Sequence, residues 1–320
     1  MKALVTGGTG FIGRQVVDLL VENGHSVRLF SRREELPGSI AGKGASLFRG
    51  DLKDPGTLLD AMEGMEVFYH IGELRNTSRR AAESNVELVK HVAGHLGRAG
   101  LRRIVFISSL TVAGIPSSTP ATEETPPRTV PGDRYTSYKK RSEQLLSAGT
   151  GGVEYVVIRP GVVYGPGSRH LGNLLRTVKR LGPLGFPWIG RGRAVAPFIH
   201  VKDLARAVYL AGIEPAASGQ VINLTDGADN TWSDFFHAIA GALGVSLRVL
   251  PVPPLFLNAP ALFFDITGLL WGSRLDLNTY VRYVTTDLLF DNGKAQRLLR
   301  WKPEYTLLRG VEEMVREYGM

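Results

Sequence analysis

The sequence contains no cysteine, which excludes disulfide bonds, thiol nucleophiles and metal sites built on cysteine. The first residues also lack the basic segment, long apolar run and cleavage site of a secretory signal. No internal repeat or low-complexity tract stands out along the chain. We therefore expect a cytoplasmic protein without a metal site.

The composition is ordinary for a globular enzyme. Of the 320 residues, 43% are hydrophobic and 21% are charged, so the chain is long enough for a large core and more than one lobe. The formal net charge of +8 could indicate nucleic-acid binding, but the basic residues are scattered in short clusters and do not form one stripe. We expect a small-molecule substrate and no nucleic-acid partner.

Four glycines lie close together near the start of the chain, directly after the short apolar run Ala3 to Val5. They are Gly7, Gly8, Gly10 and Gly13, and an apolar helical stripe follows at Phe11, Ile12, Val16, Val17 and Leu20. A structural turn is one interpretation of this pattern. Its position between a strand and a helix favours a dinucleotide site, with a pyrophosphate at the positive end of the helix.

Seven short apolar runs predict strands, and most are separated by helical patterns. They are residues 3–5, 27–30, 46–48, 67–69, 104–107, 155–158 and 221–222. This alternation predicts an α/β fold, a doubly wound parallel sheet of the Rossmann type with helices on both faces. Ligands bind such a sheet at the carboxyl ends of its strands.

The rhythm of strands and helices changes after Gly167 and again after Asn223. We expect residues 1–165 and about 198–223 to form the dinucleotide-binding domain. Residues about 166–197 and 224–320 would form a smaller C-terminal substrate lobe. The substrate would lie in the cleft between the two.

The second predicted strand ends in Ser31, Arg32 and Arg33, where an NAD site usually has an acidic residue for the ribose 2′-hydroxyl. A hydroxyl and two guanidinium groups suit a 2′-phosphate, so NADP is preferred over NAD. Plain surface charge is the alternative. Asp51 and Leu52 follow the third strand and either face the adenine ring or, for Asp51, cap the next turn.

Tyr135 and Lys139 are spaced one helical turn apart, and Ser109 follows a predicted strand. Positive charge from a lysine and an oxidised nicotinamide would favour the tyrosine phenolate, which can exchange a proton with a substrate hydroxyl or ketone. Ser109 would hold the substrate oxygen. A structural role on a helix is the alternative, but the combination with a nucleotide loop favours catalysis.

The chain resembles an extended short-chain dehydrogenase/reductase of the NAD(P)-dependent epimerase/dehydratase superfamily over nearly its full length. The motifs that carry the resemblance are TGGTGFIG, GDL, FYHIG, FISSLTVAG, YTSYK, IRPGVVYGPG, FIHVKDLARA and FDNGKAQRLLRWKPEY. Together they are highly specific.

The resemblance implies a catalytic set of Ser109, Tyr135 and Lys139, with Asn85 supporting the proton relay. Ser109 is chosen over Ser108 because it lies five residues before Gly114, as in the family pattern. The residues expected to contact the cofactor are Gly7, Gly10, Phe11, Ile12, Gly13, Ser31, Arg32, Asp51, Leu52, His70, Ile71, Gly72, Ser108, Lys139, Pro160 and Val163. For His70 a buried structural role is equally consistent, and Gly72 departs from the alanine common there.

Two features bear on the substrate. Where sugar-nucleotide enzymes of this family often have an asparagine and an arginine, this sequence has Val162 and Ala196, although Arg191 and Arg193 are near enough to substitute. The apolar segment from Leu250 to Gly272 is interrupted by polar residues, so it predicts a buried lobe helix, an apolar substrate pocket or contact with a membrane surface rather than a span.

Both features favour the branch that resembles 3β-hydroxysteroid dehydrogenases and dihydroflavonol reductases, which move hydride between NADP(H) or NAD(H) and a secondary alcohol or ketone. A nucleotide-sugar epimerase or dehydratase is the alternative, and a non-catalytic NADP-binding sensor is a third hypothesis.

The resemblance also implies a homodimer in which two helices of each copy pair into a four-helix interface. Apolar residues on the two predicted helices are Val86, Val89, Val92 and Leu96 on the first, and Leu145 and Leu146 on the second. We therefore expect a homodimer.

Overall fold

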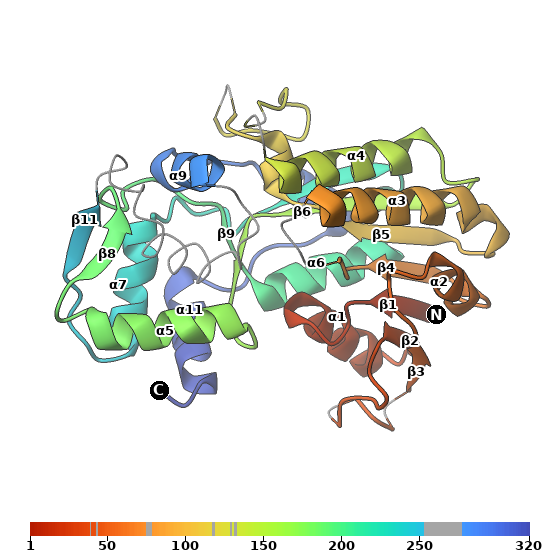
Figure 1. The fold of residues 1–320 in the computed structure, drawn as a ribbon, viewed down its shortest axis with the longest axis horizontal. Coiled ribbons are helices and arrows are strands. Elements are labelled where there is room, and N and C mark those ends of the chain that lie inside the picture. The colour runs from red at the N-terminus through yellow and green to blue at the C-terminus, as the bar shows by residue number, and fades with distance from the viewer. Residues whose placement is uncertain are drawn as a thin grey trace.

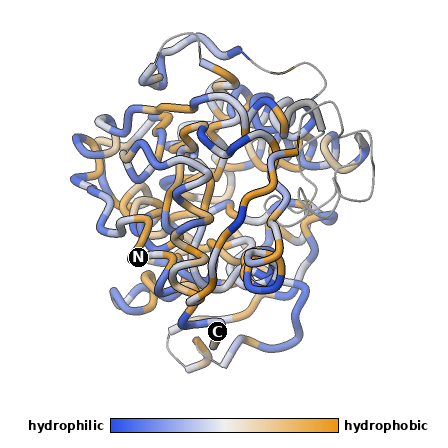
Figure 2. Tube along the Cα trace, turned by 90° about the vertical axis from the view of Figure 1, so that its left-hand side faces the viewer, coloured by the Kyte–Doolittle hydropathy of each residue, from blue (hydrophilic) through white to orange (hydrophobic). Residues whose placement is uncertain are grey.

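The structure is a computed structural model that describes residues 1–38, 40–42, 44–74, 79–116, 119–128, 130, 133–252 and 277–320. Figure 1 shows a β-sheet with its covering helices on one side and a smaller lobe around α5, α7 and α11 on the other. Figure 2 shows that hydrophobic segments run through the interior, while hydrophilic segments form much of the periphery.

All seven predicted strands are present in one parallel sheet, so the predicted fold class is confirmed. The strands are β1 (Lys2–Thr6), β2 (Ser26–Ser31), β3 (Ala45–Arg49), β4 (Val67–His70), β5 (Arg103–Ile107), β6 (Glu154–Pro160) and β10 (Gln220–Leu224). Their order is β10-β6-β5-β4-β1-β2-β3. Because the chain winds outward in opposite directions from β1 and β4, the carboxyl ends of these two strands form the switch point where a ligand binds in such sheets.

Helices cover both faces of the sheet. On one face α1 (Phe11–Glu22) packs against α6 (Val201–Ile213), and on the other lie α2 (Pro55–Met62), α3 (Arg79–His95) and α4 (Arg134–Ala148) (Figure 1). Short 3₁₀ turns are η1 (Leu96–Arg98), η2 (Leu110–Ala113) and η3 (Pro215–Ala217). Side chains fix two of the helix starts: Asp54 caps α2, and Asp133 accepts a hydrogen bond from the Thr136 N–H at the start of α4.

The smaller lobe has its own apolar core. Its elements are α5 (Arg169–Leu181), β8 (Phe186–Ile189), α7 (Trp232–Ala242), β11 (Val249–Val252), α9 (Leu277–Thr285) and α11 (Leu307–Glu317). Aromatic rings dominate this core, and the ring centroids of Trp188 and Phe236 lie 4.5 Å apart. Two further strands, β7 (Val162–Tyr164) and β9 (Phe198–His200), pair with each other. In the sequence β7 follows β6 of the large sheet, and β9 follows β8 of the lobe.

The C-terminal part of the chain contributes to both cores. Residues from α10 (Gly293–Leu299) and Trp301 pack with α1 and α6, and the Trp301 indole N–H donates to the Asp203 carbonyl oxygen at 3.0 Å. The predicted division gives these residues to the substrate lobe by number. Packing instead joins them to the core beneath the large sheet.

The apolar segment from Leu250 to Gly272 lies mostly outside the described residues. Its first three residues belong to β11, which pairs with β8. Among the described ranges, no helix combines the length and apolarity needed to cross a membrane.

Candidate active site

The glycine loop brings β1 and α1 into close contact. Gly7 has a φ of +71°, and its carbonyl oxygen accepts a hydrogen bond from the Gly10 N–H at 2.8 Å. A Cβ atom on Gly13 would lie only 2.2 Å from the Gly7 oxygen. Glycine is therefore required for the backbone packing that places the start of α1 directly at the end of β1. This cradle fits the pyrophosphate of a dinucleotide, because the first N–H groups of α1 point toward it.

A large cleft of about 2320 Å³ runs along the carboxyl ends of the strands. It is lined by almost all of the predicted site residues. The predicted cofactor residues that line it are Gly7, Gly10, Phe11, Ile12, Gly13, Ser31, Arg32, Asp51, Leu52, Ile71, Gly72, Ser108, Lys139, Pro160 and Val163. Ser109, Tyr135 and Asn85 line the same cleft. Residues far apart in the sequence are thus brought to one site.

His70 is the predicted cofactor residue that does not line this cleft. Its side chain is 3% exposed at the end of β4, and its Nδ1 lies 2.9 Å from the Thr6 hydroxyl. Burial, followed by the nearby Lys139 ammonium, lowers the pKa of His70 to about 3. The geometry corresponds to the structural alternative, a neutral histidine held beneath the floor of the site.

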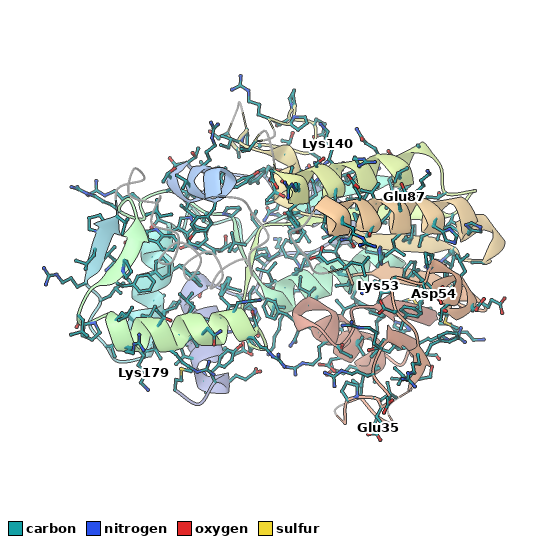
Figure 3. The ribbon with its side chains drawn as sticks, viewed as in Figure 1. Glu35, Lys53, Asp54, Glu87, Lys140 and Lys179 are labelled. Atoms are coloured by element: carbon teal, nitrogen blue, oxygen red, sulfur yellow. The ribbon has the colours of Figure 1, made fainter. Side chains whose placement is uncertain are left out.

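One end of the cleft combines hydroxyl, basic and acidic groups. Ser31, Arg32 and Lys53 line it together, and the Ser31 hydroxyl accepts a hydrogen bond from the Arg33 N–H at 3.3 Å. The Asp51 carboxylate accepts from the Lys53 N–H at 3.1 Å, so Asp51 both stabilises the local turn and faces the cleft. Lys53, which no sequence motif indicated, lies at this end beside Asp54 and the start of α2 (Figure 3).

Lys139 is held tightly at the other end of the cleft. It is 4% exposed, and its Nζ donates to the carbonyl oxygen of Ile107, the last residue of β5, at 2.7 Å. The same Nζ lies 5.8 Å from the centroid of the Tyr135 ring. The predicted pair therefore shares one face of α4, directed into the site, with the positive charge near the tyrosine.

The two serines that end β5 have different surroundings. Ser108 donates from its hydroxyl to Glu143, whose carboxylate also accepts from the Arg159 Nε at 3.0 Å, so this side chain belongs to a buried network. Ser109 accepts from the Thr111 N–H at 3.2 Å and from the Thr111 hydroxyl at 3.0 Å. Both contacts use lone pairs of the Ser109 oxygen, so its hydrogen can be donated to a substrate oxygen.

Asn85 fastens the loop that follows β4. Its Oδ1 accepts from the Leu74 N–H at 2.8 Å, and its Nδ2 donates to the carbonyl oxygens of Leu74 and Ala81, both at 3.0 Å. The side chain thus contacts backbone groups at the wall of the cleft, where it fixes the segment that carries the neighbouring Glu73.

Glu73 is a residue of the cleft that no sequence motif indicated. Its carboxylate lies 3.2 Å from the Lys139 Nζ and accepts a hydrogen bond from the Tyr138 hydroxyl. The available signal was an acidic residue three positions after His70, at the end of a buried strand of the parallel sheet. Its partner on α4 is far away in the sequence.

A small apolar cavity adjoins Ser109 of the predicted catalytic set. Ser109 and Val162 line it from the side of the large sheet, and Trp232, Leu288 and Phe290 line it from the smaller lobe. Ala196 is fully buried, and Arg191 and Arg193 are exposed and lie outside the described residues that line the cleft or this cavity. The space next to Ser109 is therefore mainly apolar.

Known proteins resemble this chain over most or nearly all of its length. The family model described as "NAD dependent epimerase/dehydratase family" matches residues 3–225. A 4-hydroxy-2-methyl-3-oxo-4-farnesyl-3,4-dihydroquinoline-1-oxide ketoreductase of Stigmatella aurantiaca is 29% identical, over 98% of this chain and 96% of the relative. A decarboxylating sterol-4-alpha-carboxylate 3-dehydrogenase of Dictyostelium discoideum is 26% identical, over 98% and 99%. A UDP-glucose 4-epimerase of Vibrio cholerae is also 26% identical, over 98% and 94%.

Solved structures share the fold. The X-ray structure of Pal from Bacillus thuringiensis aligns with a TM-score of 0.78 and 21% identity, over 100% of this chain and 99% of that one. A UDP-glucose 4-epimerase of Thermus thermophilus, solved in complex with NAD, aligns with a TM-score of 0.76 and 23% identity, over 100% and 99%.

Proposed function

Because the chain belongs to the NAD dependent epimerase/dehydratase family, a family of enzymes, we propose that it is an oxidoreductase of the extended short-chain dehydrogenase/reductase type. It would transfer hydride between a nicotinamide cofactor and a secondary alcohol or ketone on a largely apolar substrate. The single observation that carries this proposal is the apolar cavity beside Ser109, at the same end of the site as Tyr135 and Lys139.

A bound nicotinamide cofactor would supply or accept the hydride. Ser109 would donate a hydrogen bond to the substrate oxygen, and the Tyr135 hydroxyl would exchange a proton with it. Lys139 would bind the nicotinamide ribose and stabilise the phenolate of Tyr135 by its charge. The glycine loop and the start of α1 would hold the pyrophosphate, while Ser31, Arg32 and Asp51 would hold the adenosine end. Asn85, which holds the Leu74 backbone at the wall of the cleft, would support the proton relay.

The apolar lining favours a ketone over a nucleotide sugar. A nucleotide sugar carries a diphosphate that needs charged or polar partners in its pocket. Val162 lies in the cavity wall, and the buried Ala196 adds no such partner. The similarity to both a ketoreductase and a UDP-glucose epimerase keeps the epimerase as the alternative.

We propose NADP(H) as the preferred cofactor. Arg32, Arg33 and Lys53 line the cleft next to Ser31, and a 2′-phosphate would add two negative charges at this point. Asp51 at the same end is bonded to the Lys53 N–H through its Oδ1, which leaves its other oxygen for the adenosine.

A panel of apolar ketones tests the reaction directly. Purified protein is incubated with NADPH and each ketone, and in parallel with NAD and UDP-glucose. The Tyr135→Phe variant should lose ketone turnover by about 10²–10⁴-fold, because it lacks the only oxygen of that ring. Tyr209→Phe is the matched control, since Tyr209 lies on α6 beside His25, outside the described lining of the cleft. Interconversion of UDP-sugars without reduction of any ketone would replace this proposal with the epimerase.

The homodimer is also proposed, on different support from that expected. Val89, Val92, Leu96 and Leu146 are buried within the chain, where they pack in one core with the sheet and with α2, and Leu145 is partly buried on the same core. Val86 is buried as well. These residues therefore supply no free apolar face. The proposal now depends on the polar outer surface of α3 and α4, which carries Glu87 and Lys140 (Figure 3). Light scattering at micromolar concentration tests it.

We also propose a cytoplasmic location and a division of the chain into a dinucleotide-binding domain and a substrate lobe. A substrate lobe that lies across the cleft from the dinucleotide-binding domain accounts for the cavity lined from both parts of the chain.

A further inference from the structure

Glu73 and Lys139 form a charge pair at the cleft. The carboxylate Oε2 lies 3.2 Å from the ammonium Nζ, and the two side chains are 15% and 6% exposed, respectively. The same Oε2 accepts a hydrogen bond from the Tyr138 hydroxyl. A carboxylate thus shares the ammonium group on which Tyr135 depends for its ionised form.

We propose that Glu73 is a positioning residue that controls the ionisation of Tyr135 through Lys139. The inference rests on the proposed function, in which Tyr135 exchanges the proton. The negative charge of Glu73 partly cancels the electrostatic effect of the Lys139 ammonium on Tyr135. The Glu73 carboxylate also helps to hold Nζ, which donates to the Ile107 carbonyl oxygen. The phenolate of Tyr135 consequently forms at a higher pH than it would beside an unpaired lysine.

Because this pair is largely buried, we expect the effect of Glu73 on the ionisation of Tyr135 to be large. A charge pair at the protein surface is screened by water and contributes little, whereas one that is largely removed from solvent interacts strongly. Removing the negative charge of Glu73 would leave Lys139 with its full effect on Tyr135. Glu73→Gln keeps the shape of the side chain and an oxygen that can accept from Tyr138.

Other titratable groups also lie around Lys139. Tyr135 and Tyr138 face it from α4, with ring centroids 5.8 and 5.0 Å from Nζ, and Phe106 faces it from β5 at 5.1 Å. From β4, His70 is neutral because burial and Lys139 lower its pKa to about 3. Glu143 is bonded to Ser108 and Arg159 in the network behind β5. Glu73 is therefore the carboxylate in contact with Lys139 among these groups.

The test follows the ionisation of Tyr135 without relying on turnover. The full-length protein is labelled at the ring carbon that bears the tyrosine hydroxyl, and its carbon NMR spectrum is recorded against pH with NADP⁺ present. The signal that Tyr135→Phe removes is the signal of Tyr135. In Glu73→Gln its midpoint should fall by about 1 pH unit, and Glu73→Asp should return it toward the parent value.

Glu317→Gln is the matched control. Glu317 on α11 pairs with Arg14 at 3.7 Å, but both side chains are exposed and lie outside the described lining of the cleft. This variant should leave the Tyr135 midpoint unchanged. Thermal melts identify any variant that is not folded, and in that case Glu73→Ala, which also removes the negative charge, carries the comparison with the same expected fall in the midpoint.

The outcomes separate this inference from the proposed reaction. A fall in the Tyr135 midpoint together with a shift of the pH–turnover profile to lower pH supports both. The NMR shift without reduction of any ketone supports the role of Glu73 and counts against the proposed substrate. An unchanged or higher midpoint in folded Glu73→Gln overturns the inference, whatever the turnover.

Discussion

Lys139 and Ile107 join α4 to the end of β5: the lysine Nζ donates to the isoleucine carbonyl oxygen at 2.7 Å. Ile107 lies two residues before Ser109, so one hydrogen bond fixes the helix that carries Tyr135 relative to the turn that carries the serine. The relative position of the three proposed catalytic groups therefore depends on backbone as well as on side chains.

Replacing Lys139 with alanine should weaken cofactor binding and change the pH dependence. Loss of a hydrogen bond from a charged group costs about 1.5–3 kcal/mol of binding free energy. Because the positive charge near Tyr135 is removed, the pH–turnover profile should move to higher pH. Fluorescence titration and kinetics measure the two effects. Lys140→Ala, one residue along α4 and outside the described lining of the cleft, should show neither, and equal effects from both variants would contradict the assigned role.

Replacing Arg32 with alanine should weaken the binding of NADP(H) selectively. The guanidinium would lose a charge-assisted hydrogen bond to the 2′-phosphate, worth up to about 1.5–3 kcal/mol, while NAD(H) binding stays nearly unchanged. Titration of cofactor fluorescence gives both affinities. Lys179→Ala is the control, because Lys179 lies on α5 in the other lobe (Figure 3). Equal affinity of the unsubstituted protein for the two cofactors would remove the basis for NADP preference.

Replacing Gly13 with alanine should disturb the nucleotide loop. The added Cβ would lie 2.2 Å from the Gly7 oxygen, so the start of α1 must move away from β1. Overpacking of this kind costs about 1–3 kcal/mol of unfolding free energy. Gly94→Ala, in the helix α3 with no atom within 4 Å of its Cβ, should instead stabilise the protein by about 0.5–1 kcal/mol. Denaturant unfolding of both variants checks the prediction, and a neutral Gly13→Ala would contradict it.

The pH dependence of stability should carry a contribution from His70. Its pKa is about 3 in the folded chain and about 6.5 in an unfolded one. Between these values only the unfolded state takes up the proton, so stability falls as the pH falls from about 6.5 toward 3. Linkage gives a loss of about 2 kcal/mol between pH 7 and pH 5.

The His70→Gln variant isolates this term, because glutamine does not titrate. Its free energy of unfolding, measured with denaturant at pH 7 and pH 5, should decrease by about 2 kcal/mol less than that of the parent. The same decrease in both proteins would mean that His70 is protonated in the folded state.

Apolar runs were enough to predict the large sheet because buried parallel strands are apolar on both faces. The glycine loop and the residues that follow each strand predicted most of the cleft for a related reason: in a parallel sheet these positions meet at one edge. Two strands of the smaller lobe could not be found in this way. Pro187 in β8 and Pro251 in β11 argue against strands, yet a two-stranded sheet consists of edge strands, which tolerate proline.

The pairing of Glu73 with Lys139 also lay beyond the sequence. The two residues come from the end of β4 and from α4, and their distance depends on how that helix packs across the sheet. The apolar residues Val89, Val92 and Leu96 pack in the chain's own core. Periodicity identified them as a buried face, but it does not distinguish the chain's own sheet from a second copy.

The packing of α1 against α6 has a consequence for synthesis on the ribosome. The apolar residues Val16, Val17 and Leu20 are among the first to be made, whereas their partners Leu204 and Val208 come from a helix encoded much later. One edge of β6 likewise has no partner strand until β10, which ends at Leu224, has been synthesised. We expect the growing chain to expose these surfaces until that point, so that it folds slowly and gains from chaperone protection.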